Sequence, residues 1–318
     1  MRKTIYITLL ALLSGCGIYK PYSRPGTELP EQYRDINTDD TTTLAALPWK
    51  ELFTDEHLQT LIETGLQQNT DLQVARLRVK EADALLLNAR LSYLPALSLS
   101  PEGGISSYNG TTSKTYNLAA SANWELDIFG KTTNAKRGAK AALLGSREYA
   151  QAVQTQLIAN IAGKYYTLLM LDRQLEIGEE TLQSWEKSIK VLEALKASGK
   201  ANDAAVLQAR ANRMTLESSV ITLRKNITDT VNALAVLLAL SPQEIERGRI
   251  ADVRFPDELK VGVPAQLLSN RPDVRQAEQN LAQAFYATNA ARASFYPSVN
   301  LSGSIGWSNN GGGVITNP

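Results

Sequence analysis

One segment of this sequence occurs twice, about 200 residues apart. The first copy spans residues 71–99 and the second spans residues 273–301, with Asp, Ala, Ala-Arg and Pro in matching positions. In each copy, apolar residues recur at helical spacing up to a proline, Pro95 or Pro297, and then alternate as in a strand. A repeat of this length predicts a duplicated fold whose unit is a helix leading into strands.

The second copy is followed by much less sequence than the first. We therefore expect the second repeat to be truncated, and the complete gene product to be about 150 residues longer. We expect that the chain as given does not work alone, because its third strand would leave an unpaired edge, which lipid does not tolerate.

Composition excludes several kinds of site. The chain has 318 residues and a net charge of +1, which gives no electrostatic basis for binding nucleic acid. It has one histidine, His57, and one cysteine, Cys16, too few for a His/Cys metal cluster or for Ser-His and Cys-His nucleophile pairs. We predict no enzyme, no cofactor and no metal site, and we interpret His57 as an ordinary residue of a first helical turn.

The amino terminus is typical of an exported lipoprotein. Basic residues precede an apolar run at 5–13, which is too short to span a bilayer as a helix. Leu13-Ser-Gly-Cys16 then resembles a bacterial lipobox. We predict a signal peptide over 1–15 and a lipidated tether over 16–50 that begins at Cys16. The alternative is a signal peptide cut elsewhere, with a chance cysteine.

A helix is predicted from about residue 57 to 91, within a first-repeat helical segment at 51–94, and a β-hairpin follows at 95–130. A Gly-, Asn- and Thr-rich loop is expected at 101–114. The second strand alternates cleanly, with one apolar and one polar face. Its polar face carries the residues that we predict to line a lumen: Asn117, Ser121, Asn123, Glu125 and Asp127.

This two-faced hairpin fits either a soluble sandwich or a transmembrane barrel. Export and acylation favour the barrel. Two hairpins per full protomer would give four strands, fewer than the roughly eight of the smallest barrels, so several chains must share one barrel.

A Pro-free stretch predicts a long α-hairpin over 131–241. Its first helix covers about 133–198, its turn lies at Gly199, and its second helix begins after an N-cap at Asn202 or Asp203 and runs to about Leu240. A mid-body segment at 242–262, the helix of the second repeat at 263–296 and the start of a second hairpin at 297–318 complete the chain.

Three segments carry a family resemblance. Trp124-Glu-Leu-Asp-Ile-Phe-Gly-Lys131 resembles the strand-to-helix junction of TolC-like outer-membrane efflux proteins. The block from Val261 to Glu278, with its Asn-Arg-Pro-Asp-Val centre, resembles their lipoprotein (NodT-type) branch. Residues 237–243 resemble the Leu-Leu-Gly-Leu-Ser-Pro helix end, with Ala239 in place of the glycine.

The resemblance implies a mainly α-helical fold with a transmembrane β part: a homotrimer in outer-membrane lipid with a periplasmic helical tunnel. It implies a passive exit duct for drugs, metals or other small molecules, joined to an inner-membrane RND-type pump through a periplasmic adaptor. The alternatives are a periplasmic adaptor or a structural lipoprotein with a coiled-coil hairpin.

The tip of the hairpin is expected to meet the adaptor. The family's tip motif Gly-x-x-Ser-x-x-Asp is altered here, because Ala205 replaces its frequent Asp. The residues that we predict at this contact are Gly199, Lys200, Asn202, Asp203 and Leu207.

Overall fold

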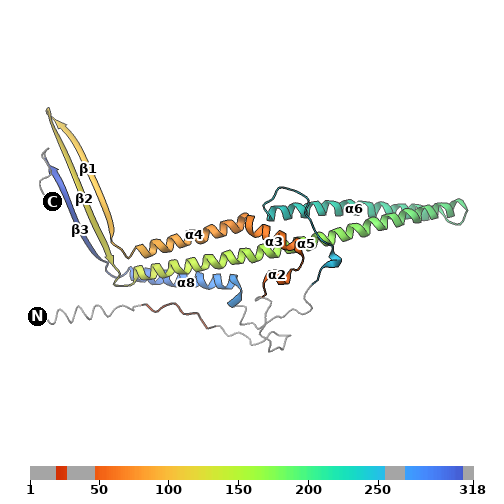
Figure 1. The fold of residues 1–318 in the computed structure, drawn as a ribbon, viewed down its shortest axis with the longest axis horizontal. Coiled ribbons are helices and arrows are strands. Elements are labelled where there is room, and N and C mark those ends of the chain that lie inside the picture. Colours follow the sequence, from red (N-terminus) through yellow and green to blue (C-terminus); the bar gives the residue numbers. More distant parts are fainter. Residues whose placement is uncertain (1–18, 27–46, 255–268, 311–318) are drawn as a thin grey trace. The chain divides into compact units, whose positions relative to one another are not determined.

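A computed structural model describes residues 19–26, 47–254 and 269–310. Helices predominate, and the strands form a separate part of the fold (Figure 1). In chain order the elements are α2 (Trp49–Leu52), α3 (Glu56–Gln68), α4 (Thr70–Leu91), β1 (Ala96–Tyr108), β2 (Thr111–Leu126), α5 (Lys131–Ala197), α6 (Asp203–Leu237), the short 3₁₀ helix η2 (Ile250–Asp252), α8 (Pro272–Ala293) and β3 (Val299–Asn310).

The chain divides into two compact units. The strand unit comprises 1–28, 77–149 and 272–318, and the hairpin unit comprises 29–76 and 150–271. Helices α4 and α5 contribute residues to both. No helix in the described part of the chain combines the length and the apolar character needed to cross a bilayer.

In the strand unit, the three strands form one antiparallel sheet in the order β1-β2-β3. The prediction of a loop at 101–114 is wrong, because β1 and β2 continue through these residues to a tight turn at Asn109-Gly110. These two residues have φ of 49° and 77°, as a two-residue hairpin turn requires. Cross-strand hydrogen bonding therefore overrides a composition that is typical of loops.

The helices of the strand unit pack on α5. Leu143 of α5 is buried with Ala82 and Leu86 of α4. Elsewhere in the unit, Glu148 of α5 accepts a hydrogen bond from Arg275 of α8 at 2.5 Å. The α4 and α8 segments, which are the helices of the two repeats, thus both contact α5.

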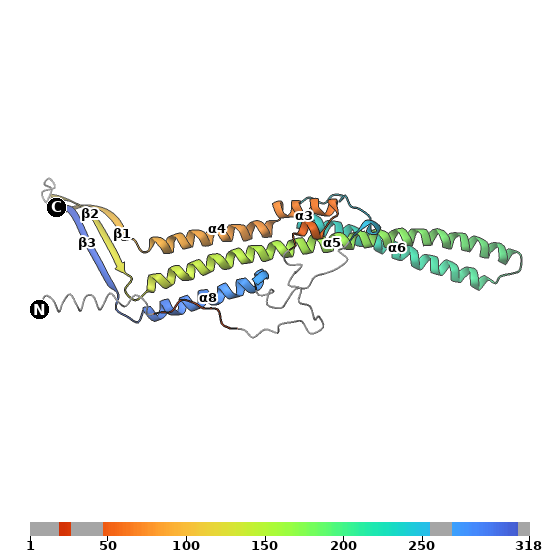
Figure 2. The same ribbon diagram turned by 60° about the horizontal axis from the view of Figure 1, so that its bottom comes forward.

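The core of the hairpin unit joins α3, α5 and α6. Leu58 and Ile62 of α3 are fully buried against Tyr165 and Leu168 of α5 and Leu234 of α6. Burying side chains of this size stabilises the fold by about 1.5–3 kcal/mol each. Beyond this core α5 and α6 continue side by side to their turn (Figure 2).

The single helix predicted for about 57–91 is two helices, because the chain breaks at Asn69. This residue has φ −57° and ψ 126°, outside the helical region. Its side-chain oxygen accepts from Leu72 N–H at 2.9 Å and caps α4, and its amide nitrogen donates to Leu237 C=O at 3.0 Å, at the end of α6. One buried side chain thus satisfies unpaired groups of two helix ends.

Helix α6 ends at Leu237, slightly before the predicted end, in a Schellman motif. Ala239 N–H bonds Val236 C=O at 3.1 Å and Leu240 N–H bonds Ala235 C=O at 2.9 Å. This geometry places Ala239 at φ 53°, in the left-handed region that favours glycine. It is the position where the related sequence pattern has glycine.

The segment after α6 is fastened to α5 by two contacts. The Tyr165 hydroxyl donates to Asp55 at 2.7 Å and accepts from Gly248 N–H at 3.1 Å. Arg247 donates to both carboxylate oxygens of Asp172, at 2.5 and 3.0 Å. The described part of the predicted mid-body segment is thus held by side chains; its residues 255–262 lie outside the described residues.

Candidate functional site

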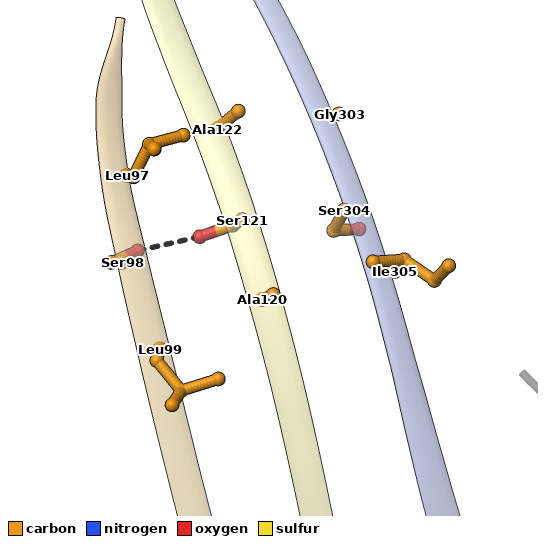
Figure 3. A pocket seen from close by; sticks show the side chains of 9 residues that line it. All are labelled: Leu97, Ser98, Leu99, Ala120, Ser121, Ala122, Gly303, Ser304 and Ile305. Carbon is orange, nitrogen blue, oxygen red and sulfur yellow. Dashed lines mark hydrogen bonds between the residues drawn. The ribbon is translucent and has the colours of Figure 1, made fainter.

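The sheet of the strand unit has one polar and one apolar face. Directly paired residues share a face, and successive residues alternate between faces. Ser98, Ser121 and Ser304 form one polar row, and the Ser98 and Ser121 hydroxyl oxygens lie 2.6 Å apart (Figure 3). The rows on either side are Ala96-Asn123-Ser302, Ser100-Ala119-Gly306 and Glu102-Asn117-Ser308.

The opposite face is apolar and open. Its rows include Leu97-Ala122-Gly303, Leu99-Ala120-Ile305 and Pro101-Leu118-Trp307. A shallow hollow in the sheet is lined by residues of the first two of these rows and by the serines between them (Figure 3): Leu97, Ser98, Leu99, Ala120, Ser121, Ala122, Gly303, Ser304 and Ile305. The side chains are strongly exposed, 79% for Leu97 and 58% for Ile305. An apolar surface of this extent indicates contact with lipid or with protein.

Four of the predicted lumen residues lie together on the polar face of β2: Asn117, Ser121, Asn123 and Glu125. Glu125 forms an ion pair with Lys131 at 2.9 Å. Asp127 lies beyond the end of the strand. Its carboxylate accepts from Thr132 N–H at 2.8 Å and from Thr133 N–H at 2.7 Å, and so caps the start of α5.

The predicted lumen set lacked the polar residues of the neighbouring strands. Ser98, Glu102 and Ser304 join the predicted set through strand pairing. Polar and apolar residues alternate in β1 and β3 as they do in β2. Glu102 lies four positions after Ser98, an even number, and so belongs on the same polar face. This spacing could have identified Glu102 from the sequence. The Gly-rich composition around it concealed that signal.

The predicted tip residues lie together at the α5–α6 turn. Gly199 has φ 73°, and Lys200 N–H bonds Leu195 C=O at 2.8 Å, which ends α5 in a Schellman motif. Of the two N-cap candidates, Asn202 caps α6 by accepting from Ala205 N–H at 3.0 Å, while Asp203 pairs with Lys196 at 2.6 Å.

Two tip side chains remain open for a contact. Lys200 is exposed, and the Leu207 side chain is 58% exposed.

Cys16 lies outside the described residues, but the segment that follows it docks on α8. Tyr22 N–H donates to the Tyr286 hydroxyl at 3.3 Å, and the Tyr22 ring packs edge-on against Phe285. Arg24 pairs with Glu278 at 2.5 Å. Sequence reasoning gave no contact for this segment, because its Pro-rich composition is typical of a tether.

Comparison with known proteins is consistent with this architecture. The family model for outer membrane efflux protein matches residues 61–240 and 263–316. The chain is 29% identical to the cation efflux system protein CusC of Escherichia coli O6:H1 over 306 residues, which is 92% of this chain and 65% of CusC. It is 32% identical to the toluene efflux pump outer membrane protein TtgF of Pseudomonas putida, covering 96% of this chain and 68% of TtgF.

A solved structure agrees with these sequence relatives. The open state of the Neisseria gonorrhoeae MtrE outer membrane channel superposes with a TM-score of 0.81 at 26% identity, covering 91% of this chain and 66% of MtrE. The mainly helical fold with a β part is therefore confirmed. The chain belongs to the outer membrane efflux protein family.

Proposed function

We propose that this chain is the outer-membrane channel component of a tripartite efflux system. The observation that carries the proposal is the two-faced sheet in a chain of this family. Over residues 116–126 of β2, one face is apolar and the other carries polar and small residues, and this pattern suits a barrel with lipid outside and water inside. Because open strand edges are not tolerated in lipid, three full protomers, each with two hairpins, would share one closed barrel.

Transport through such a duct is passive. Hydroxyl and amide side chains such as Ser98, Ser121 and Asn123 hydrogen-bond water and keep the lumen hydrated, and they do not bind one cargo tightly. Catalysis forms no part of this function, and an inner-membrane pump of the RND type supplies the energy. The names of the relatives point to cations for CusC and to toluene for TtgF, so the cargo is a small molecule or ion delivered by the pump.

The tip of the hairpin joins this duct to the pump through a periplasmic adaptor. Lys200 and Leu207 are exposed there, on a turn whose backbone is fixed by Gly199 and Asn202. A rigid turn lowers the entropy lost when the adaptor binds.

The amino-terminal segment would hold the strand unit at the membrane surface. A lipidated Cys16 lies six positions before Tyr22, so the extended chain between them reaches at most about 20 Å. The docking of Tyr22 and Arg24 on α8 therefore keeps the lipid near that helix.

Expression in an efflux-deficient strain tests the proposal. The full-length gene product should fractionate with the outer membrane and be released only by detergent, should restore efflux with its adaptor and pump, and should conduct ions in planar bilayers. Recovery of a Cys16→Ala variant in the soluble periplasmic fraction would show that the strands are not embedded. It would favour an adaptor or a structural lipoprotein instead.

A further inference from the structure

We propose that Glu102 sets a cation preference in the lumen. This inference rests on the proposed channel function, because it requires the polar face of the sheet to line the conducting path. It concerns a residue outside the predicted lumen set, within a stretch whose composition suggested a loop.

The charges of the sheet are few and unevenly placed. The charged residues of β1, β2 and β3 are Glu102, Lys114 and Glu125. Lys114 pairs with Ile105 in the strand register and lies on the apolar face. Glu102 and Glu125 lie on the polar face.

These two carboxylates differ in their surroundings. Glu125 is neutralised by Lys131 at 2.9 Å. Glu102 is exposed, and no cation of the described residues forms an ion pair with it. The neighbours of Glu102 across the sheet are Asn117 and Ser308, which are neutral. On the described polar face, Glu102 thus carries the uncompensated charge.

The Glu125–Lys131 pair contributes little to the potential near Glu102. Glu125 lies about 26 Å along β2 from Asn117, the direct partner of Glu102. Because Glu125 and Lys131 form an ion pair with no net charge, the potential of the pair falls off steeply over that distance, even at low salt. Glu102 therefore dominates the potential at its own level of the sheet.

Three protomers would bring three such carboxylates to one level of the barrel. Rings of Asp or Glu raise the local concentration of cations and lower that of anions, and this is how many cation channels discriminate. In a wide, wetted lumen the effect is electrostatic and long-ranged. It should therefore weaken as salt shortens the Debye length from about 30 Å at 0.01 M to about 3 Å at 1 M.

Reversal potentials in a KCl gradient across planar bilayers test the inference. Glu102→Gln should lower the K⁺ over Cl⁻ permeability ratio about threefold at 10 mM salt and have little effect at 1 M. Glu102→Asp should retain the preference, and Glu102→Lys should reverse it. Immunoblots of outer-membrane fractions establish that the variants assemble equally.

Lys114→Gln is the matched control, because it removes a charge from the same sheet on the opposite face. It should not lower the K⁺ over Cl⁻ permeability ratio, because it removes a cation rather than an anion, about 10 Å along β2 from the partner of Glu102. A Glu102→Gln channel that conducts with the wild-type ratio at 10 mM would refute the inference and leave the channel function standing. A full-length wild-type protein that neither conducts nor restores efflux would overturn both.

Discussion

The buried Tyr165 hydroxyl donates a hydrogen bond to the Asp55 carboxylate at 2.7 Å, linking residues far apart in the sequence. The same hydroxyl accepts from Gly248 N–H, and the second oxygen of Asp55 accepts from Leu58 N–H at 3.1 Å. One phenol thus connects the start of α3, the middle of α5 and the segment after α6.

Replacing Tyr165 by Phe should lower the free energy of unfolding by about 1–3 kcal/mol, because Gly248 N–H and Asp55 lose their shared partner. Thermal unfolding in detergent measures the loss, and hydrogen exchange should accelerate in the peptide that contains Gly248. Tyr149→Phe on the same helix serves as a control. Unchanged exchange at Gly248 in the Tyr165 variant would contradict the predicted fastening.

The same contact predicts a loss of stability in alkali. Burial is the main cause that raises the pKa of Tyr165, and the Asp55 carboxylate adds to it. In the folded state, the Tyr165 hydroxyl therefore keeps its proton above pH 10, whereas in the unfolded chain this hydroxyl ionises there. The stabilisation is complete below that pH and falls by about 1.4 kcal/mol per pH unit above it. Between pH 8 and pH 11, the melting temperature of the Tyr165→Phe variant should fall less steeply than that of the wild-type protein.

The two left-handed helix ends predict opposite effects of substitution. Ala239 has φ 53° and Gly199 has φ 73°. Ala239→Gly should raise the free energy of unfolding by about 1 kcal/mol, because glycine removes the strain of a Cβ in this region. Gly199→Ala should lower it by a similar amount. Equal melting temperatures for the two variants would show that neither end is strained.

The two faces of β2 should differ in their tolerance of charge. Leu118→Arg places a cation on the lipid face and should cost about 2–4 kcal/mol near mid-bilayer, whereas Asn117→Arg on the adjacent position should be tolerated. The amount of heat-stable trimer in outer-membrane fractions measures the difference. Equal yields from both variants would exclude a barrel with lipid on the apolar face.

Cysteine substitutions at the tip should report on the adaptor. Lys200→Cys or Ala205→Cys introduces a thiol that a bifunctional reagent can join to a co-expressed adaptor; Cys16, the one cysteine of the natural sequence, is predicted to carry lipid. We expect an adduct from Lys200, which is exposed, and a weaker one from Ala205, which is partly buried. A working pump that gives no adduct from either position would refute the contact.

Local signals in the sequence predicted the ends of the α-hairpin well. Gly199 supplies the left-handed residue after α5, and Asn202 supplies the cap of α6, and both roles depend on backbone geometry within one turn. The alternation in β2 was equally informative, because polar and apolar residue types that alternate with period two indicate directly which residues share a face.

Features that depend on distant partners were missed. The break at Asn69 lies inside an unbroken apolar pattern, and its cause is the carbonyl of Leu237. The strand through Glu102 is imposed by pairing with Asn117 and overrides a loop-like composition. The docking of Tyr22 on α8 likewise has no signal near Tyr22 itself.

The bridge from Asn69 to Leu237 fixes one end of the α5–α6 hairpin and leaves the other end unconstrained in length. Inserting seven residues into each of the two helices beyond this bridge would keep every side chain on its original face. The turn would then move outward by about 10 Å. The hairpin is in this sense an adjustable spacer, whose reach can evolve to match the width of the gap between two membranes while the core around Tyr165 stays unchanged.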